Sequence, residues 1–216
     1  MFDRPPPSRR PTQNPQADSV ERLCRLYDAR LAQADGRLSP DHARDLEALA
    51  GLFGLDADRP VAALWRELRR RILRRAAGQE EAPAPKAALA APGSAVAGEP
   101  LTLLVVEDDP ETAADLTAFL IEAGHRVVGP FHNAAAAEAA AALHPVDAAL
   151  LDINLSDGAD GSVLAESLIR RWGVRIIFVS GDGPALERQA GLADVVVMKP
   201  YTGAQILAAV AGLSPA

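Results

Sequence analysis

Short apolar runs alternate with stretches of helical periodicity over the second half of the chain. The apolar and β-branched runs predict five strands, at residues 101–106, 126–129, 148–152, 175–180 and 195–198. Apolar residues three or four positions apart predict helices between them, at 110–123, 134–143, 162–172 and 202–212, with a shorter one near 184–190. This alternation predicts an α/β domain built on an open, doubly wound parallel sheet with right-handed crossovers.

The first half of the chain carries three helical patterns between residues 18 and 77. Gly36 favours the end of the first helix, and Ser39-Pro40 has the cap and first-turn residues that favour the start of the second. The apolar stripes of the three helices are Val20, Leu23, Cys24, Tyr27 and Leu31; Leu46, Leu49 and Phe53; and Val61, Leu64, Trp65, Leu68 and Ile72. A small all-α domain is therefore expected in front of the α/β domain.

Two stretches of the chain lack such a pattern. Residues 1–17 are rich in proline and aperiodic, which predicts a disordered tail. Residues 78–100 are rich in alanine, proline and glycine, which predicts a linker without a core of its own. The chain is thus expected to divide into a tail at 1–17, a helical domain at 18–77, a linker at 78–100 and an α/β domain at 101–216.

Charge is divided unevenly between the two halves. Residues 1–100 carry 16 Lys and Arg against 14 Asp and Glu, whereas residues 101–216 carry 6 against 15. The acidic half is not expected to bind nucleic acid or an anionic membrane surface through its own field. No apolar run approaches the ~20 residues of a membrane span, and the N-terminus lacks the apolar core of a signal peptide. The single cysteine, Cys24, fits a reducing compartment, so we expect a cytoplasmic protein without a membrane partner.

Polar residues follow four of the predicted strands. Three carboxylates, Glu107, Asp108 and Asp109, come directly after the first strand, and such like charges are favourable together only with a bound cation or full solvation. Asp152 ends the third predicted strand, Ser180 ends the fourth, and Lys199 follows the fifth. Because ligands of such sheets bind at the carboxyl ends of the strands, these residues are expected to converge.

Carboxylates without His or Cys favour a hard cation such as Mg²⁺. A lysine and a hydroxyl beside it could hold phosphoryl oxygens, and an aspartate could be the nucleophile that forms an acyl phosphate. The pattern therefore predicts a phosphoryl-transfer site.

Four motifs carry a resemblance to a known family. The acid pair Glu107-Asp108, the acid in LLDINL, the hydroxyl in FVSG and the Lys-Pro in VMKPY are similar, in order and spacing, to the receiver domain of two-component response regulators. The resemblance covers roughly residues 101–213 and implies a flavodoxin-like sheet with strand order 2-1-3-4-5.

The resemblance also implies a role for each matching residue. Asp152 would be phosphorylated by a histidine kinase or a phosphotransfer protein. Asp108, Asp152 and the backbone carbonyl of Asn154 would bind Mg²⁺, with Glu107 acting mainly through water. Ser180 and Lys199 would bind the phosphoryl oxygens.

The sequence departs from the usual receiver pattern at three places. The segment from Ser180 to Lys199 is short, which predicts a truncated or missing fourth helix of the receiver. Val196 stands where most receivers have an aromatic switch residue, and the loop DINLSDGADG has Ser156 where proline is common and is one residue longer. The sequence therefore does not predict the usual coupling between the hydroxyl and an aromatic residue.

The short fourth-helix region resembles the atypical FAT GUY receivers. Phe178, Val179, Ser180 and Gly181 match that motif, while Asp182 replaces its tyrosine. In the family, the position of Asp182 influences dephosphorylation, although an acid in a turn is an equally good interpretation.

Several alternatives accompany this interpretation. His42 could be imagined as a phosphodonor, but the chain lacks a nucleotide-binding loop and a phosphotransfer signature. The arginines of RELRRRILRR allow a DNA-binding regulator, although arginines late in a helix also favour its dipole, so nucleic acid is not the expected partner. A receiver-like scaffold that is never phosphorylated is a further class. An aspartate-based phosphohydrolase would need a second acid at the position of Asn154.

We therefore expect a bacterial response regulator of a two-component system or phosphorelay, a phosphoacceptor rather than an enzyme. Phosphorylation of Asp152 is expected to change a contact of the helical domain with an unidentified output partner or with a second copy of the chain. Either contact is expected because three short helices bury their apolar stripes poorly by themselves.

Overall fold

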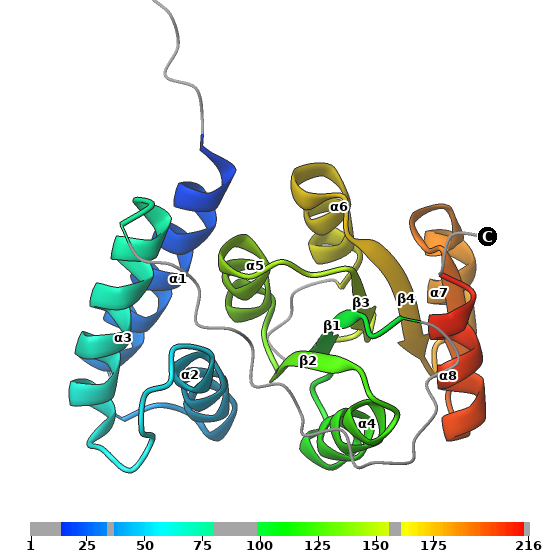
Figure 1. Ribbon diagram of the computed structural model, residues 1–216, viewed down its shortest axis with the longest axis horizontal. Coiled ribbons are helices and arrows are strands. Elements are labelled where there is room, and N and C mark those ends of the chain that lie inside the picture. The colour runs from blue at the N-terminus through cyan, green and yellow to red at the C-terminus, as the bar shows by residue number, and fades with distance from the viewer. Residues whose placement is uncertain (1–13, 34–36, 80–98, 156–160, 214–216) are drawn as a thin grey trace, which may run out of the picture.

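The computed structural model describes residues 14–33, 37–79, 99–155 and 161–213, with only the backbone of Leu186 and Ala190. These residues form a parallel sheet with helices on both faces and three further helices at one side (Figure 1). Most of the expected tail and linker, and Ser156 with its loop, lie outside the described residues. The first helix begins at Pro15, so the last residues of the expected tail are helical.

Five parallel strands form one sheet in the order β2-β1-β3-β4-β5, which confirms the expected topology. The strands are β1 Thr102–Val106, β2 Arg126–Phe131, β3 Ala148–Leu151, β4 Arg175–Ser180 and β5 Val195–Met198. Val106 pairs with Leu151, and Leu151 pairs with Phe178. The carboxyl ends of β1 and β3 are therefore level with each other, and β4 continues two residues further, to Ser180.

Strand β2 is longer than expected. It continues through Pro130 to Phe131, beyond the glycine at which the sequence pattern breaks. Proline is tolerated because β2 is an edge strand, where a missing N–H removes no inner ladder bond. Gly129 has φ +115° and a Cβ there would lie 2.9 Å from the Val105 carbonyl oxygen, so only glycine fits this irregular pairing.

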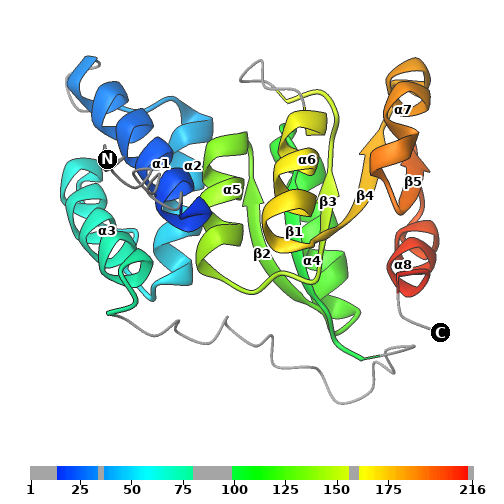
Figure 2. The same ribbon diagram turned by 90° about the horizontal axis from the view of Figure 1, so that it is seen from above.

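Helices cover both faces of the sheet (Figure 2). Helices α4 and α8 pack on one face, and helices α5 and α6 on the other, with the short α7 beside β4. Their bounds are α4 Pro110–Glu122, α5 Ala134–Leu143, α6 Gly161–Trp172, α7 Gly183–Gln189 and α8 Gly203–Ala211, with a 3₁₀ turn at Ala190–Leu192. The expected short helix near 184–190 is thus present.

Three N-terminal helices pack against α5 rather than standing apart (Figures 1 and 2). They are α1 Pro15–Gln33, α2 Pro40–Leu52 and α3 Val61–Ala76. Their stripes join the core of the sheet in one hydrophobic cluster, in which Leu23, Tyr27, Leu49 and Leu68 are fully buried. Because the stripes are covered within the chain, they no longer give a reason to expect either a docked partner or a homodimer.

The alanine-rich helix α5 lies between the N-terminal helices and the sheet (Figure 2). Its sequence, AAAAEAAAAL, buries six side chains besides the single charge: Ala136, Ala137, Ala139, Ala140, Ala141 and Leu143. Small side chains let the neighbouring backbones approach closely on both sides. The alanines therefore serve packing.

Glu138, the one charged residue of α5, ties α5 to α1 and α6. It is buried, and its carboxylate accepts hydrogen bonds from Ser19 at 3.2 Å and from Ser167 at 2.7 Å. The Arg22 guanidinium lies 2.5 Å away, and that of Arg171 3.6 Å away. A buried carboxylate is stable only when it is paired and hydrogen-bonded in this way.

Among the described residues, no helix is long and apolar enough to cross a membrane.

Candidate functional site

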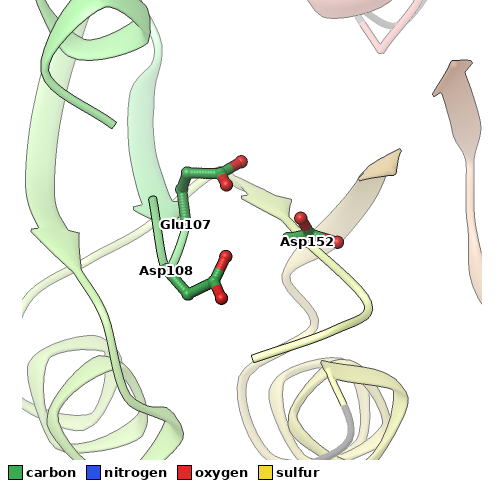
Figure 3. Close-up of side chains that lie close together, drawn as sticks. All are labelled: Glu107, Asp108 and Asp152. Carbon is green, nitrogen blue, oxygen red and sulfur yellow. The ribbon is translucent and has the colours of Figure 1, made fainter. Parts of the chain in front are cut away.

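Three carboxylates meet at the carboxyl ends of β1 and β3 (Figure 3). Glu107 and Asp108 follow β1, and Asp152 follows β3, which is paired with β1 in parallel. The Asp152 N–H donates to the Val106 carbonyl at 2.9 Å, which fixes the two strand ends side by side. One carboxylate oxygen from each of the three residues lies within 4.8 Å of the others. The expected convergence of these three residues is therefore observed.

The Lys199 ammonium lies between two of these carboxylates. Its Nζ donates to Glu107 Oε1 at 2.8 Å, to Glu107 Oε2 at 2.6 Å and to Asp152 Oδ2 at 2.7 Å. Glu107 is 1% exposed and Asp152 7% exposed. Lys199 therefore supplies the positive charge that two nearly buried carboxylates require.

Electrostatics at the site follow from burial and from these contacts. Burial raises the pKa of Glu107, although the hydrogen bonds and charge of Lys199 act against this effect. Burial acts to lower the pKa of Lys199, but the hydrogen bonds and charges of Asp152 and Glu107 prevail and raise that pKa. Lys199 is thus held as a cation beside Asp152.

Asp109, the third acid of the EDD run, is not part of this cluster. Its Oδ1 accepts from the Thr112 N–H at 2.7 Å and caps α4. That hydrogen bond lowers the pKa of Asp109. Asp109 therefore has a structural role that the sequence pattern alone did not separate from that of its two neighbours.

The backbone after β3 passes close to the start of α6. The Asn154 N–H donates to Asp152 Oδ1 at 3.1 Å, which orients the carboxylate. A Cβ at Gly161 would lie 2.2 Å from the Asp152 carbonyl oxygen, so a larger residue would displace this segment. The expected metal contact of the Asn154 carbonyl stays a prediction.

The remaining candidate residues lie at the end of β4, just after it, and within β5. Ser180 is buried at the end of β4, and its backbone carbonyl accepts from the Lys199 N–H at 3.0 Å. Asp182 Oδ1 accepts from the Ala185 N–H at 2.9 Å and so holds the start of the short α7. Val196 lies on β5 with 39% of its surface exposed. The modulating roles expected for Asp182 and Val196 stay predictions.

The donor set of the cluster fits Mg²⁺. Three carboxylates from Glu107, Asp108 and Asp152 offer only hard oxygen donors, and Asp108 is open to solvent in part. Mg²⁺ is usually held by one or two carboxylates together with water and phosphate oxygens. The cluster offers three carboxylates, and the partial exposure of Asp108 leaves that side accessible to water.

His42 lies elsewhere, on α2. Its Nδ1 is 2.7 Å from Ser39 Oγ, and its ring meets the Tyr27 ring edge-on with centroids 6.0 Å apart. Only 9% of His42 is exposed. A phosphodonor has to reach a partner's aspartate, and this placement gives no support to that alternative.

Asp45 is a buried acid that the sequence interpretation missed. It lies on α2, is fully buried, and accepts hydrogen bonds from His132 and Asn133, which follow β2. Asp45 lies one turn before Leu49 and so stands on the apolar stripe of its helix. Glu138 is likewise the only charged residue in a run of alanines. An acid on an apolar helix face was therefore the available signal for both residues.

Comparison with known proteins gives one consistent family. A model of the response regulator receiver domain matches residues 103–211, just over half of the chain. The chain is 38% identical over 104 residues to the TorCAD operon transcriptional regulatory protein TorR of Escherichia coli O157:H7. The aligned residues cover 47% of this chain and 44% of that protein. The chain is 36% identical over 107 residues to the transcriptional activator protein PfeR of Pseudomonas aeruginosa, covering 48% and 34% respectively.

A solved structure supports the same fold. The REC domain of the Erythrobacter litoralis PhyR response regulator superposes with a TM-score of 0.50 at 23% identity, covering 54% of this chain and 95% of that domain.

These matches also limit two expectations. The chain spans less than half the length of either curated relative. Both are named as transcriptional regulators, so the expectation that nucleic acid is not a partner finds no support in them. The FAT GUY type stays a prediction, because the matching model is that of the general family. The chain belongs to the response regulator receiver domain family of two-component systems, with its receiver domain at residues 103–211.

Proposed function

We propose that this protein is a phosphorylation-dependent response regulator whose phosphoacceptor is Asp152. The observation that carries the proposal is the cluster of Glu107, Asp108 and Asp152 within 4.8 Å, with the Lys199 ammonium 2.7 Å from Asp152. The donor would be a histidine kinase or a phosphotransfer protein.

In the proposed reaction, an Asp152 carboxylate oxygen attacks the phosphorus of a phosphohistidine. A new P–O bond forms, the P–N bond breaks, and the leaving imidazole keeps the electron pair and takes a proton from water. The product is an acyl phosphate on Asp152. The chain is a signalling phosphoacceptor in this scheme, and no substrate turnover is required of it.

Neighbouring side chains would position and stabilise the transferred group. The Lys199 ammonium donates a hydrogen bond to Asp152 and would donate to a phosphoryl oxygen once Asp152 is phosphorylated. The Ser180 hydroxyl, at the end of β4 beside Lys199, would donate to another phosphoryl oxygen. Asp108, Asp152 and the Asn154 carbonyl, with Glu107 acting through water, would hold Mg²⁺. When bound, Mg²⁺ would neutralise the negative charge that gathers on carboxylates and phosphate.

Magnesium affinity tests this assignment through two adjacent acids. We expect Asp108→Asn to weaken Mg²⁺ binding at least about tenfold, because a carboxylate of the cluster is lost. Asp109→Asn is the matched control, because Asp109 caps α4 and asparagine caps helices equally well. Isothermal titration calorimetry with MgCl₂ measures both.

Equal Mg²⁺ affinity in Asp108→Asn and wild type would contradict the assignment. A loss of the same size in Asp109→Asn would also contradict it, because the effect would then come from general negative charge near β1.

A second candidate function is supported by helix α3. Its sequence has six arginines and one glutamate. Its outer side has a hollow of about 470 Å³ lined by Arg66, Arg69, Arg70, Leu73, Arg74 and Gln79. Asp28 pairs with Arg69, and Glu67 with Arg70. Arginine-rich surfaces of this kind bind phosphates, so we propose duplex DNA as a further partner.

Salt dependence of DNA binding tests this candidate. We expect the full chain to bind a fluorescein-labelled duplex at about 50 mM salt, with an affinity that falls steeply as salt rises. Reversing Arg66 and Arg74 to glutamate should reduce the slope of log affinity against log salt by about two. Arg25→Glu on α1 serves as the control. Wild-type protein that binds no DNA at low salt, as followed by fluorescence anisotropy, would exclude this function.

A further inference from the structure

The last residue of β2 and the two residues after it join the carboxylate cluster to the N-terminal helices. On one side, the Phe131 carbonyl accepts a hydrogen bond of 3.0 Å from the Glu107 N–H. On the other side, the next two residues, His132 and Asn133, donate to Asp45 of α2. Three consecutive residues therefore contact both the candidate site and the helical part of the chain.

Asp45 holds this segment through both of its carboxylate oxygens. Oδ1 is 2.7 Å from the His132 backbone nitrogen and 2.9 Å from His132 Nδ1. Oδ2 is 3.1 Å from the Asn133 backbone nitrogen and also accepts from the Asn133 side-chain amide. All of these groups are buried, so water cannot replace Asp45 without a rearrangement.

Asn133 extends the same contact into α5. Its Oδ1 accepts from the Ala136 N–H at 2.9 Å and caps α5, the helix against which α1 and α2 pack. One carboxylate of α2 thus fixes the end of β2 and, through Asn133, the start of α5. We therefore expect a shift of this segment to alter the docking of α2.

The other end of the sheet offers no comparable route among the described residues. Val196 on β5 lacks an aromatic ring, and the main packing partners of β5 are β4 and α8 rather than α1, α2 or α3. The segment Phe131–Asn133, in contrast, contacts Glu107 on one side and α2 on the other.

We propose that Asp45 is a positioning residue that couples the docking of the N-terminal helices to the carboxylate cluster, through the segment Phe131–Asn133. The inference rests on the proposed function, because it concerns the Mg²⁺ and phosphoryl site formed by Glu107, Asp108 and Asp152. Coupling of this kind is reciprocal. If metal binding at the cluster favours one position of residues 131–133, docking of α2 through Asp45 changes the metal affinity by the same factor.

Asp45→Asn is the variant that tests the coupling. Asparagine keeps the size of the side chain but has one acceptor oxygen, and its amide would face the donors that Asp45 now satisfies. We expect Mg²⁺ affinity, measured by titration calorimetry on the full chain, to weaken at least about fivefold. The binding stoichiometry must stay near one, which separates weaker binding from partial unfolding.

Glu138→Gln is the matched control. Glu138 is also a buried acid that ties the N-terminal helices to the receiver domain, through Ser19 and Arg22, but it makes no described contact with residues 131–133. We expect its Mg²⁺ affinity to equal that of wild type even where thermal stability falls as much as in Asp45→Asn.

Each outcome of the titrations has one meaning. Weaker binding in Asp45→Asn alone supports the coupling. Wild-type affinity in Asp45→Asn, or an equal loss in both variants, overturns the coupling while the proposed function stands. Absence of Mg²⁺ binding in wild type overturns the proposed function and this inference together.

Amide hydrogen exchange in the wild-type chain gives an independent test that needs no substitution. The backbone amides of His132 and Asn133 donate to Asp45, so their exchange reports this contact directly. We expect their exchange rates to change when Mg²⁺ and acetyl phosphate are added. Unchanged rates at these two amides, in a chain that is phosphorylated, would overturn the inference even if Asp45→Asn does not fold.

Discussion

Lys199→Met is expected to tighten Mg²⁺ binding by about tenfold and to slow phosphoryl transfer from acetyl phosphate by about 100-fold. The two effects have opposite directions for one reason. In the structure the Lys199 ammonium is hydrogen-bonded to both Glu107 and Asp152, so it competes with a cation for their oxygens. Without the ammonium, the cluster attracts Mg²⁺ more strongly but lacks the charge that stabilises the transferred phosphoryl group.

Titration calorimetry and phosphorylation kinetics measure these two effects on the same variant. Lys199→Arg is the control, because it keeps the positive charge and replaces the ammonium by a planar guanidinium. We expect the Mg²⁺ affinity of this variant to stay close to that of wild type. If the Lys199→Met protein is phosphorylated by acetyl phosphate at the wild-type rate, Lys199 has only a structural role, as the counter-charge of two buried carboxylates.

Tyr27→Ala is expected to lower the free energy of unfolding by about 3–5 kcal/mol, as for other large core residues. Tyr27 is fully buried on α1, and its ring stacks on Trp65 with centroids 4.9 Å apart. Its hydroxyl donates to the His42 carbonyl at 3.0 Å. Tyr27→Phe should cost only about 1 kcal/mol, because it removes that hydrogen bond and keeps the packing.

The same substitution tests whether the two halves of the chain unfold together. The only two tryptophans lie one in each half, Trp65 on α3 and Trp172 on α6. Fluorescence of Trp65→Phe and Trp172→Phe proteins therefore reports each half separately during urea unfolding. We expect the two transitions to coincide and to shift together in Tyr27→Ala. A shift confined to the Trp65 transition would show that the helical part is an independent domain.

Sequence periodicity predicted the receiver fold closely, for a physical reason. A central parallel strand is buried on both faces and reads as a continuous apolar run, and the intervening helices bury one stripe each. Each of these signals is local in the sequence. The end of β2 was predicted less well, because a proline is allowed only at a sheet edge, and edge position follows from topology.

The candidate site was predictable to the same degree, whereas the packing of the two halves was not. Glu107, Asp108, Asp152 and Lys199 each follow a strand, so a parallel topology alone brings them together. The docking of α1–α3 on α5 depends on pairings between distant segments, such as that of Asp45 with residues 132–133. No periodicity within one segment contains that information.

The central claim is that Asp152 accepts a phosphoryl group, and intact-protein mass spectrometry tests it most directly. The wild-type chain is incubated with acetyl phosphate and Mg²⁺, beside Asp152→Asn and beside wild type with EDTA. The account predicts one added phosphoryl group on wild type only, removed by hydroxylamine as an acyl phosphate should be. Equal phosphorylation of Asp152→Asn, or none on wild type with either acetyl phosphate or a phosphorylated histidine kinase, would contradict it.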